Sequence, residues 1–241
     1  GLGAWWSVLP QLTQIGTLAL ILGAVMQHRL GVSISTGAAV PYVVYMLPGV
    51  LLWQLFHDTL VQVASALPAQ RLILKKNPVD LSLLPLYVPL VNLAPFGVGL
   101  GLLWLLVSWF WHPIGVDVIG VTVLCAVGLL LLAYVVGLVW GMVAVLIPDV
   151  GMALPSLLQI GFWLTPIVYP AGILPESVRA VLQGWHPWYG LIAPAQSAWT
   201  GLPASVSLPP SLLVPVALLF LHAWLLARML RHGRKVLLDA L

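Results

Sequence analysis

Long apolar segments alternate with short polar ones along the chain. Six of these segments are long enough, or nearly so, to cross a bilayer as helices, because an α-helix rises about 1.5 Å per residue and a bilayer core is about 30 Å thick. The pattern therefore predicts an all-α polytopic membrane protein, one transmembrane domain over residues 1–241. Its six predicted transmembrane helices are approximately 5–27, 42–66, 86–109, 119–146, 152–169 and 208–226.

The fifth segment is the shortest, and the chain after it does not become uniformly polar. Met152 to Tyr169 would span about 27 Å as a helix, which barely crosses the bilayer core. Prolines then interrupt the segment, and residues 171–203 are predicted to form short re-entrant or interfacial helices. The best defined is a 175–186 helix, where apolar residues recur at helical spacing between polar ones. Its defining residues are Pro175, Glu176, Val178, Leu182 and Trp185.

Basic residues are distributed unequally between the two predicted faces. With six spans, the 67–84 loop, the 147–151 turn and the tail from Arg228 share one face, and they hold seven of the nine Lys and Arg residues. Arg29 and Arg179 are on the other face. By the positive-inside rule the first face is cytoplasmic. Both termini are then cytoplasmic, and the 175–186 helix lies on the extracytoplasmic face.

The composition excludes several classes of protein. Hydrophobic residues make up 61% of the chain and charged residues 6%, whereas a soluble domain has about 25% charged residues. Nine basic residues are too few for a nucleic-acid surface, so no nucleic acid is expected as a partner. Cys125 is the single cysteine, which leaves no disulfide framework within one chain. Because the chain starts at Gly1 without a cleavable signal peptide, we expect it to begin inside a longer product.

Sequence motifs for catalysis are absent. No G-x-x-x-x-G-K-[ST] phosphate-binding loop occurs, so the chain is not expected to bind ATP itself. No H-E-x-x-H or G-x-S-x-G motif occurs, and no histidines stand at metal-ligand spacing. The chain is therefore predicted to be neither an enzyme nor the holder of a metal or cofactor.

His57 and Asp58 lie inside the second predicted span, where ionisable groups are costly and usually face a bundle interior or an aqueous cavity. They either line a polar conduit or make a satisfied contact between helices. Aromatic residues are further conduit candidates, because sugar faces stack on aromatic rings, although the aromatic belt at the membrane surface explains many of them. Three candidates lie away from the ends of predicted spans, Trp104, Trp140 and Trp163. A fourth, Tyr169, is at the end of the fifth predicted span.

One stretch resembles a known family. Its matching residues are Leu158, Gln159, Ile160, Phe162, Leu164, Thr165, Pro166, Ile167, Tyr169, Pro170, Leu174 and Pro175, then His186, Pro187, Gly190, Leu191 and Ile192. This run resembles the permease subunits of ABC-2-type polysaccharide exporters, which export O-antigen, capsule or teichoic-acid chains. Further similarity covers 7–11, 48–56 and 72–85.

The resemblance implies a homodimeric exporter in a bacterial cytoplasmic membrane, with separate nucleotide-binding ATPase subunits that hold ATP and Mg. The cargo would be a lipid-linked polysaccharide, moved outward between two permease chains and in contact with membrane lipid. In the family a basic cytoplasmic loop couples to the ATPase. The matching residues are Arg71, Leu72, Ile73, Leu74, Lys75, Lys76, Asn77 and Pro78, with Asp149 in the next cytoplasmic turn.

The sequence departs from the family pattern at two places, since Asn77-Pro78 replaces an aromatic-proline pair and Pro148-Asp149 replaces a basic-aspartate pair. Two alternatives remain open. One is an exporter of the same family that carries a drug or a lipid. The other is an intramembrane polyprenyl-phosphate enzyme, which would need clustered acids at membrane depth.

Overall fold

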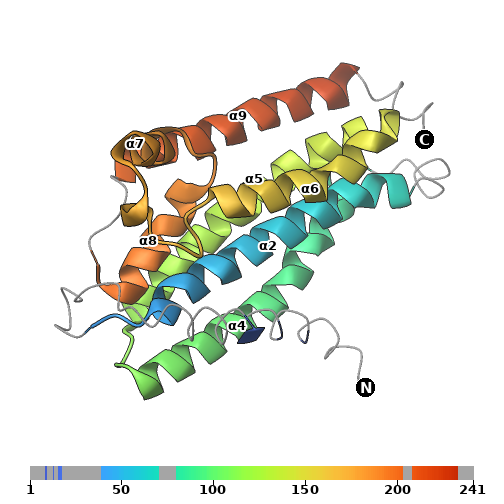
Figure 1. Cartoon of the computed structure of the whole chain (residues 1–241). Coiled ribbons are helices and arrows are strands. Elements are labelled where there is room, and N and C mark those ends of the chain that lie inside the picture. The colour runs from blue at the N-terminus through green and yellow to red at the C-terminus, as the bar shows by residue number, and fades with distance from the viewer. Residues whose placement is uncertain are drawn as a thin grey trace, which may run out of the picture.

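The computed structural model of the chain describes residues 39–70, 80–202 and 208–232, and four isolated positions before them, Leu9, Thr13, Gly16 and Thr17. Within these ranges the fold is all-helical, as predicted (Figure 1). Most of the predicted first span, the basic segment 71–79 and the tail after His232 lie outside the described residues.

Among the described residues, four helices are long and apolar enough to cross a membrane: α2 (Tyr42–Ala69), α4 (Tyr87–Phe110), α5 (Val116–Leu146) and α9 (Leu208–His232). The 3-10 turn η1 (Leu84–Leu86) directly precedes α4. The four helices correspond to the second, third, fourth and sixth predicted spans. This agrees with a membrane protein. The total of six spans stays a prediction, because the first span lies outside the described residues and α6 (Pro148–Leu164) has only 17 residues.

The predicted tight turn at 147–151 is wrong. Only Ile147 is non-helical, with φ −132° and ψ 91°, and α6 begins at Pro148. The physical reason lies in the first two residues of α6. Pro148 cannot continue α5 but suits the first position of a new helix, and Asp149 in that first turn favours the positive end of the helix dipole. The two helices therefore form a hairpin with one residue between them.

The end of the fifth predicted span is also corrected. α6 ends at Leu164, not Tyr169, because Thr165 precedes Pro166 and a residue before proline is driven out of the helical region. Thr165 is extended, with φ −90° and ψ 133°. The 3-10 turn η2 (Ala171–Ile173), helix α7 (Glu176–Trp185) and helix α8 (Tyr189–Thr200) follow. α7 confirms the predicted short helix, with Pro175 as its N-cap residue.

α8 does not stay at the surface. Its Tyr189, Ile192, Ala193 and Trp199 are buried, and it contacts α2, α5 and α9. The Trp199 indole N–H donates to the Thr122 hydroxyl of α5 at 2.9 Å, which ties α8 to the bundle. The predicted 171–203 region thus contains short helices, of which α8 is buried in the bundle, while their placement relative to the membrane stays a prediction.

α2 is the centre of the bundle. In its most apolar window 72% of residues are buried, against 33% in α4 and α5 and 6% in α9, so the core forms around α2. Figure 1 shows α2 running between α4 on one side and α5 with α6 on the other. α5 approaches α2 closely at two glycines. A Cβ on Gly137 would lie 2.9 Å from Val63, and a Cβ on Gly141 would lie 2.8 Å from the Ala64 carbonyl oxygen.

Candidate functional site

One side of α2, from its middle onward, carries five polar residues. Gln54, His57, Asp58, Gln62 and Ser65 are spaced so that they share one face of the helix. His57 Nδ1 lies 2.9 Å from Asp58 Oδ1, with side chains 32% and 55% exposed. The amide oxygen of Gln54 is buried without a hydrogen-bond partner among the described residues. We call these five residues the polar face of α2.

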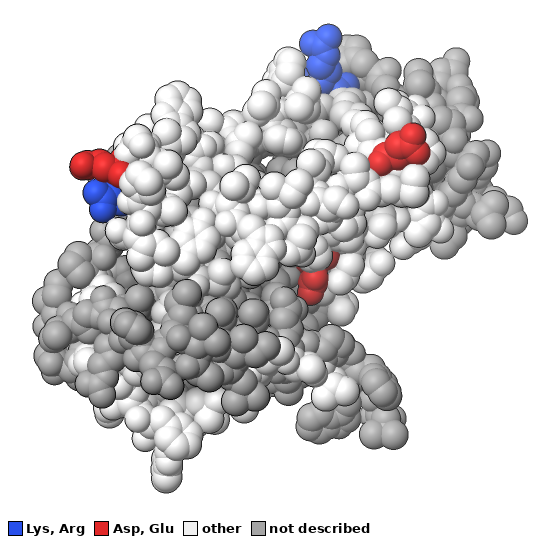
Figure 2. Space-filling model, in the orientation of Figure 1, with Lys and Arg blue, Asp and Glu red and all other residues white. Residues whose placement is uncertain are grey.

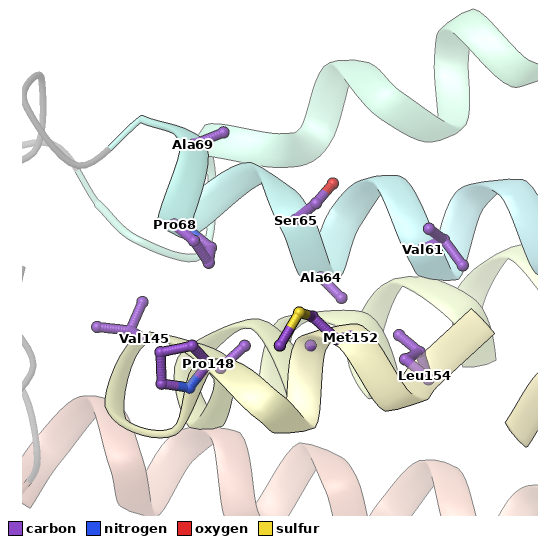
Figure 3. A pocket seen from close by; sticks show the side chains of 11 residues that line it. Val61, Ala64, Ser65, Pro68, Ala69, Val145, Pro148, Met152 and Leu154 are labelled. Atoms are coloured by element: carbon purple, nitrogen blue, oxygen red, sulfur yellow. The ribbon is translucent and has the colours of Figure 1, made fainter. Parts of the chain in front are cut away.

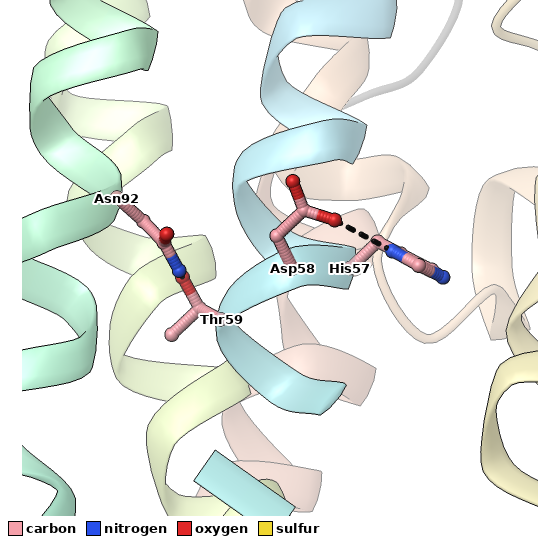
Figure 4. Close-up of polar contacts among 4 residues, drawn as sticks. All are labelled: His57, Asp58, Thr59 and Asn92. Atoms are coloured by element: carbon pink, nitrogen blue, oxygen red, sulfur yellow. Dashed lines mark hydrogen bonds and ion pairs between the residues drawn. The ribbon is translucent and has the colours of Figure 1, made fainter. Parts of the chain in front are cut away.

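A different flank of α2 is fully covered. Asn92 of α4 donates through Nδ2 to the Thr59 hydroxyl at 3.2 Å, and both residues are buried. In Figure 4 Thr59 and Asn92 point toward one another, while His57 points away from α4. The polar contact between α2 and α4 is thus satisfied within the chain, whereas the His57–Asp58 pair faces outward.

The exposure of this pair has an energetic consequence. A charged side chain facing hydrocarbon near the bilayer centre costs about 2.5–3.5 kcal/mol or more, so such groups face water or another protein surface. His57 and Asp58 lie near the middle of α2, far from both ends of a helix of 28 residues. Figure 2 shows few charged atoms on this side of the molecule. The polar face is therefore suited to contact water or a second protein surface.

α6 forms the neighbouring wall. Met152 of α6 and Val61 of α2 line one cavity, so these sides of the two helices face a common space. Gln159 follows Met152 by seven residues and lies on the same side of α6, where it is exposed. Ser65 of the polar face lines this cavity, and Gln159 is exposed farther along the same side of α6.

An aromatic cluster joins α2 to the end of α6. The ring centroids of Trp53 and Phe56 of α2, Phe162 of α6 and Trp188 lie 5.5–5.8 Å apart in four pairs. Gly161 permits this packing, because a Cβ there would lie 2.8 Å from the Trp188 ring. The cluster fixes the segment before α8 against α2 and α6.

A hydrogen-bond network holds the same junction. The buried Thr165 hydroxyl donates to the Gly161 carbonyl at 2.6 Å and accepts the Trp188 indole N–H at 2.8 Å. His186 Nε2 lies 3.4 Å from the same hydroxyl. His186 Nδ1 accepts the backbone N–H of Tyr189 at 3.2 Å, so the neutral ring carries its proton on Nε2. One threonine hydroxyl therefore connects the end of α6 with the start of α8.

Burial lowers the pKa of His186 from 6.5 to about 4. The neutral form is therefore the native one near pH 7. It is also the form that the first turn of α8 needs, because an imidazolium could not accept the Tyr189 N–H and would oppose the positive end of the helix dipole. His186 is therefore a structural residue at this junction.

The turn between α6 and η2 is held from two further helices. The Tyr45 hydroxyl donates to the Pro166 carbonyl at 3.0 Å and lies 3.2 Å from the Tyr169 carbonyl. The Gln196 amide of α8 donates to the carbonyls of Pro166 and Ile167 at 3.3 and 3.2 Å. The most specific part of the family-like stretch is thus a rigid turn.

The predicted aromatic candidates do not form one site. The Tyr169 hydroxyl donates to the Trp163 carbonyl at 3.0 Å, and Trp163 is 57% exposed on α6. Trp104 donates to the Ile114 carbonyl at the α4–α5 connection, and Trp140 packs against the main core. Trp163 and Tyr169 are therefore together near the end of α6, while Trp104 and Trp140 lie elsewhere.

The remaining predicted residues divide into two groups. On α7, Val178 and Trp185 are 44% and 76% exposed, Leu182 is half-buried, and Glu176 lies 3.7 Å from Arg179, a surface pair worth little stability. The exposed apolar stripe suits a membrane surface. Of the predicted coupling residues, Asp149 is exposed in the first turn of α6, and 71–78 lie outside the described residues.

Scans against models of known protein families and against curated proteins gave no match. The resemblance to polysaccharide exporters therefore stays a prediction.

Sequence reasoning missed the two features that organise the site. The Thr165–His186–Trp188 network joins residues 21 and 23 positions apart, and no local pattern signals it. The polar face of α2 was detectable, because Gln54, Gln62 and Ser65 recur with His57 and Asp58 at helical spacing. Only the two ionisable members were identified.

Proposed function

We propose that this chain is the transmembrane subunit of an ATP-binding-cassette exporter that moves a lipid-linked polysaccharide across a bacterial cytoplasmic membrane. The observation that carries the proposal is the exposed polar face of α2, with the His57–Asp58 pair in the middle of a membrane-length helix. A hydroxyl-rich glycan can cross a bilayer only along a hydrated, polar wall, because unsatisfied polar groups in hydrocarbon cost several kcal/mol.

One copy of the chain offers half of such a conduit. α2 and α6 each expose polar residues, Asp58 and Gln159 among them, and Trp163 is exposed for sugar stacking toward the end of α6. A second copy that faces these sides of α2 and α6 would complete the conduit and would keep the charged pair away from lipid. The proposal is therefore a homodimer with the conduit between the copies.

Energy for transport would come from a separate ATPase subunit, since the sequence holds no phosphate-binding loop. The basic segment 71–78 and Asp149 are the proposed docking site at the cytoplasmic face. The same-family alternative, export of a lipid or drug, differs in cargo alone. A polyprenyl-phosphate enzyme differs in that it would turn over substrate without an ATPase.

The test uses co-expression with the ATPase subunit that the proposal requires. Lys75→Glu combined with Lys76→Glu should leave the permease inserted, reduce co-purification of the ATPase and stop export of surface polysaccharide. Arg231→Glu on α9, an exposed position, is the matched control and should leave all three unchanged. Undiminished co-purification and export in the double variant would refute the docking site. ATP hydrolysis stimulated by phospholipid or drug, but not by lipid-linked glycan, would favour the alternative cargo.

A further inference from the structure

A cavity of about 540 Å³ opens where α2 ends beside the α5–α6 hairpin (Figure 3). Val61, Ser65 and Pro68 of α2 line one wall, and Met152 and Leu154 of α6 line the other, with Val145 of α5 at the base. In Figure 3 the Met152 side chain reaches toward α2. Its volume lies within the range of about 300–1,000 Å³ that is usual for small-molecule sites.

The walls select against polar ligands. Among the described residues that line the cavity none is charged, and Ser65 supplies their only side-chain polar group. The Ser65 hydroxyl already donates to the Gln62 carbonyl of its own helix at 3.1 Å. A sugar or nucleotide entering this space would lose its hydrogen bonds to water without replacement. A hydrocarbon chain would instead gain about fourfold in affinity for each methylene buried.

Part of the cavity would lie at the depth of lipid chains if α2 spans a bilayer. Its α2 wall covers residues 61–69, the last turns of the helix, which extend about 12 Å from the helix end at 1.5 Å per residue. One leaflet of a bilayer core is about 15 Å deep. Met152 is 71% exposed at the cavity, which therefore opens to its surroundings at this depth.

The cavity adjoins the polar face of α2. Val61 lies one turn after His57 and Asp58, and Ser65 belongs both to the cavity wall and to the polar face. An apolar compartment thus continues directly into a polar one along the same side of one helix. A molecule with a hydrocarbon chain and a hydroxyl-rich part would contact both compartments.

We propose that this cavity binds the hydrocarbon chain of a membrane amphiphile. If the proposed transport function holds, the chain is the lipid carrier of the glycan, and its site is beside the conduit rather than inside it. The binding itself requires only the cavity, so it can be tested apart from transport.

The test is photolabelling of the full chain in lipid nanodiscs. One probe is a diazirine-bearing polyprenyl phosphate, and the other is a phosphatidylcholine with the diazirine on its acyl chain. Mass spectrometry should find the label concentrated on residues 61–69 and 144–154. Ser65→Trp fills the cavity and should lower this labelling by about fifteenfold, the equivalent of two displaced methylenes. Ala69→Phe at the exposed rim is a second blocking variant, and Leu131→Trp on the exposed side of α5 is the control.

Each outcome has one reading. Labelling by the polyprenyl probe alone identifies the carrier lipid, and equal labelling by both probes identifies a phospholipid chain as the occupant. Label spread evenly over the exposed sides of α4 and α9, or unchanged by both blocking variants, overturns the proposal. Failure of the Lys75 and Lys76 test with labelling intact would remove the ATPase docking site and leave the lipid site standing.

Discussion

Replacing Thr165 by valine removes one hydroxyl and leaves the shape of the side chain almost unchanged. No cavity forms, and the Gly161 carbonyl keeps the backbone N–H of Thr165 as a donor at 3.0 Å. The cost comes from the Trp188 indole N–H, which loses its acceptor at 2.8 Å. An orphaned buried donor costs about 1–3 kcal/mol. The weaker contact to His186 at 3.4 Å adds up to about 1 kcal/mol.

We therefore expect Thr165→Val to lower the free energy of unfolding by about 2–3 kcal/mol. The assay is tryptophan fluorescence during unfolding in mixed detergent micelles. Thr165→Ser keeps the hydroxyl and should cost about 1 kcal/mol for the lost methyl group. Ser65→Ala, which removes a hydroxyl bonded only to its own helix, should change stability by less than about 0.5 kcal/mol.

A double-mutant cycle makes the prediction specific to the indole. In a Trp188→Phe background the donor is already gone, so Thr165→Val should cost about 1–2 kcal/mol less than in the native chain. Strict additivity of the two substitutions would refute the network as the source of the stability.

Two further predictions concern the junction and the core. The pKa of His186 is about 4 in the folded chain and 6.5 unfolded, so the unfolded state binds more protons between these values and stability falls as the pH drops below 6.5. At pH 5 the loss should be about 2 kcal/mol relative to pH 7, and His186→Asn should flatten this part of the profile; an unchanged profile would contradict the burial. Gly141→Leu should destabilise by about 3 kcal/mol or more in the same unfolding assay, because a Cβ there already lies 2.8 Å from an α2 carbonyl oxygen, whereas Gly97→Leu, with nothing within 4 Å, should be nearly neutral. Equal effects of the two glycine substitutions would argue against the close approach of α5 to α2.

The long helices were predictable because their signal is local. Each bilayer-length apolar segment in the described ranges appears as a helix, and α7 was visible from proline boundaries and amphipathic spacing. Helix ends were less predictable, because Pro148 and Thr165 decide them by backbone rules that hydropathy does not report. α6 therefore begins four residues earlier and ends five residues earlier than expected.

Long-range contacts were not predictable from one sequence. His186 is partly buried through its contacts with Thr165 and Trp188, and the sequence does not show that Thr165 lies beside it. The cavity has the same origin, since its walls come from α2, α5 and α6 and no segment alone is hollow. Periodicity shows which side of a helix is polar, while only the packed structure shows which side is left uncovered.

The central claim is that water reaches the polar face of α2 at membrane depth. The most direct measurement is substituted-cysteine labelling in membranes with a charged, water-soluble thiol reagent, on a Cys125→Ala background. Gln62→Cys on the polar face should react rapidly, because the thiolate forms only where water is present. The controls are Leu131→Cys and Leu124→Cys on α5, where the native side chains are 54% and 73% exposed in apolar surroundings. Both cysteines should stay unreactive. If the cysteine of Gln62→Cys reacts as slowly as the two on α5, the proposed conduit is contradicted.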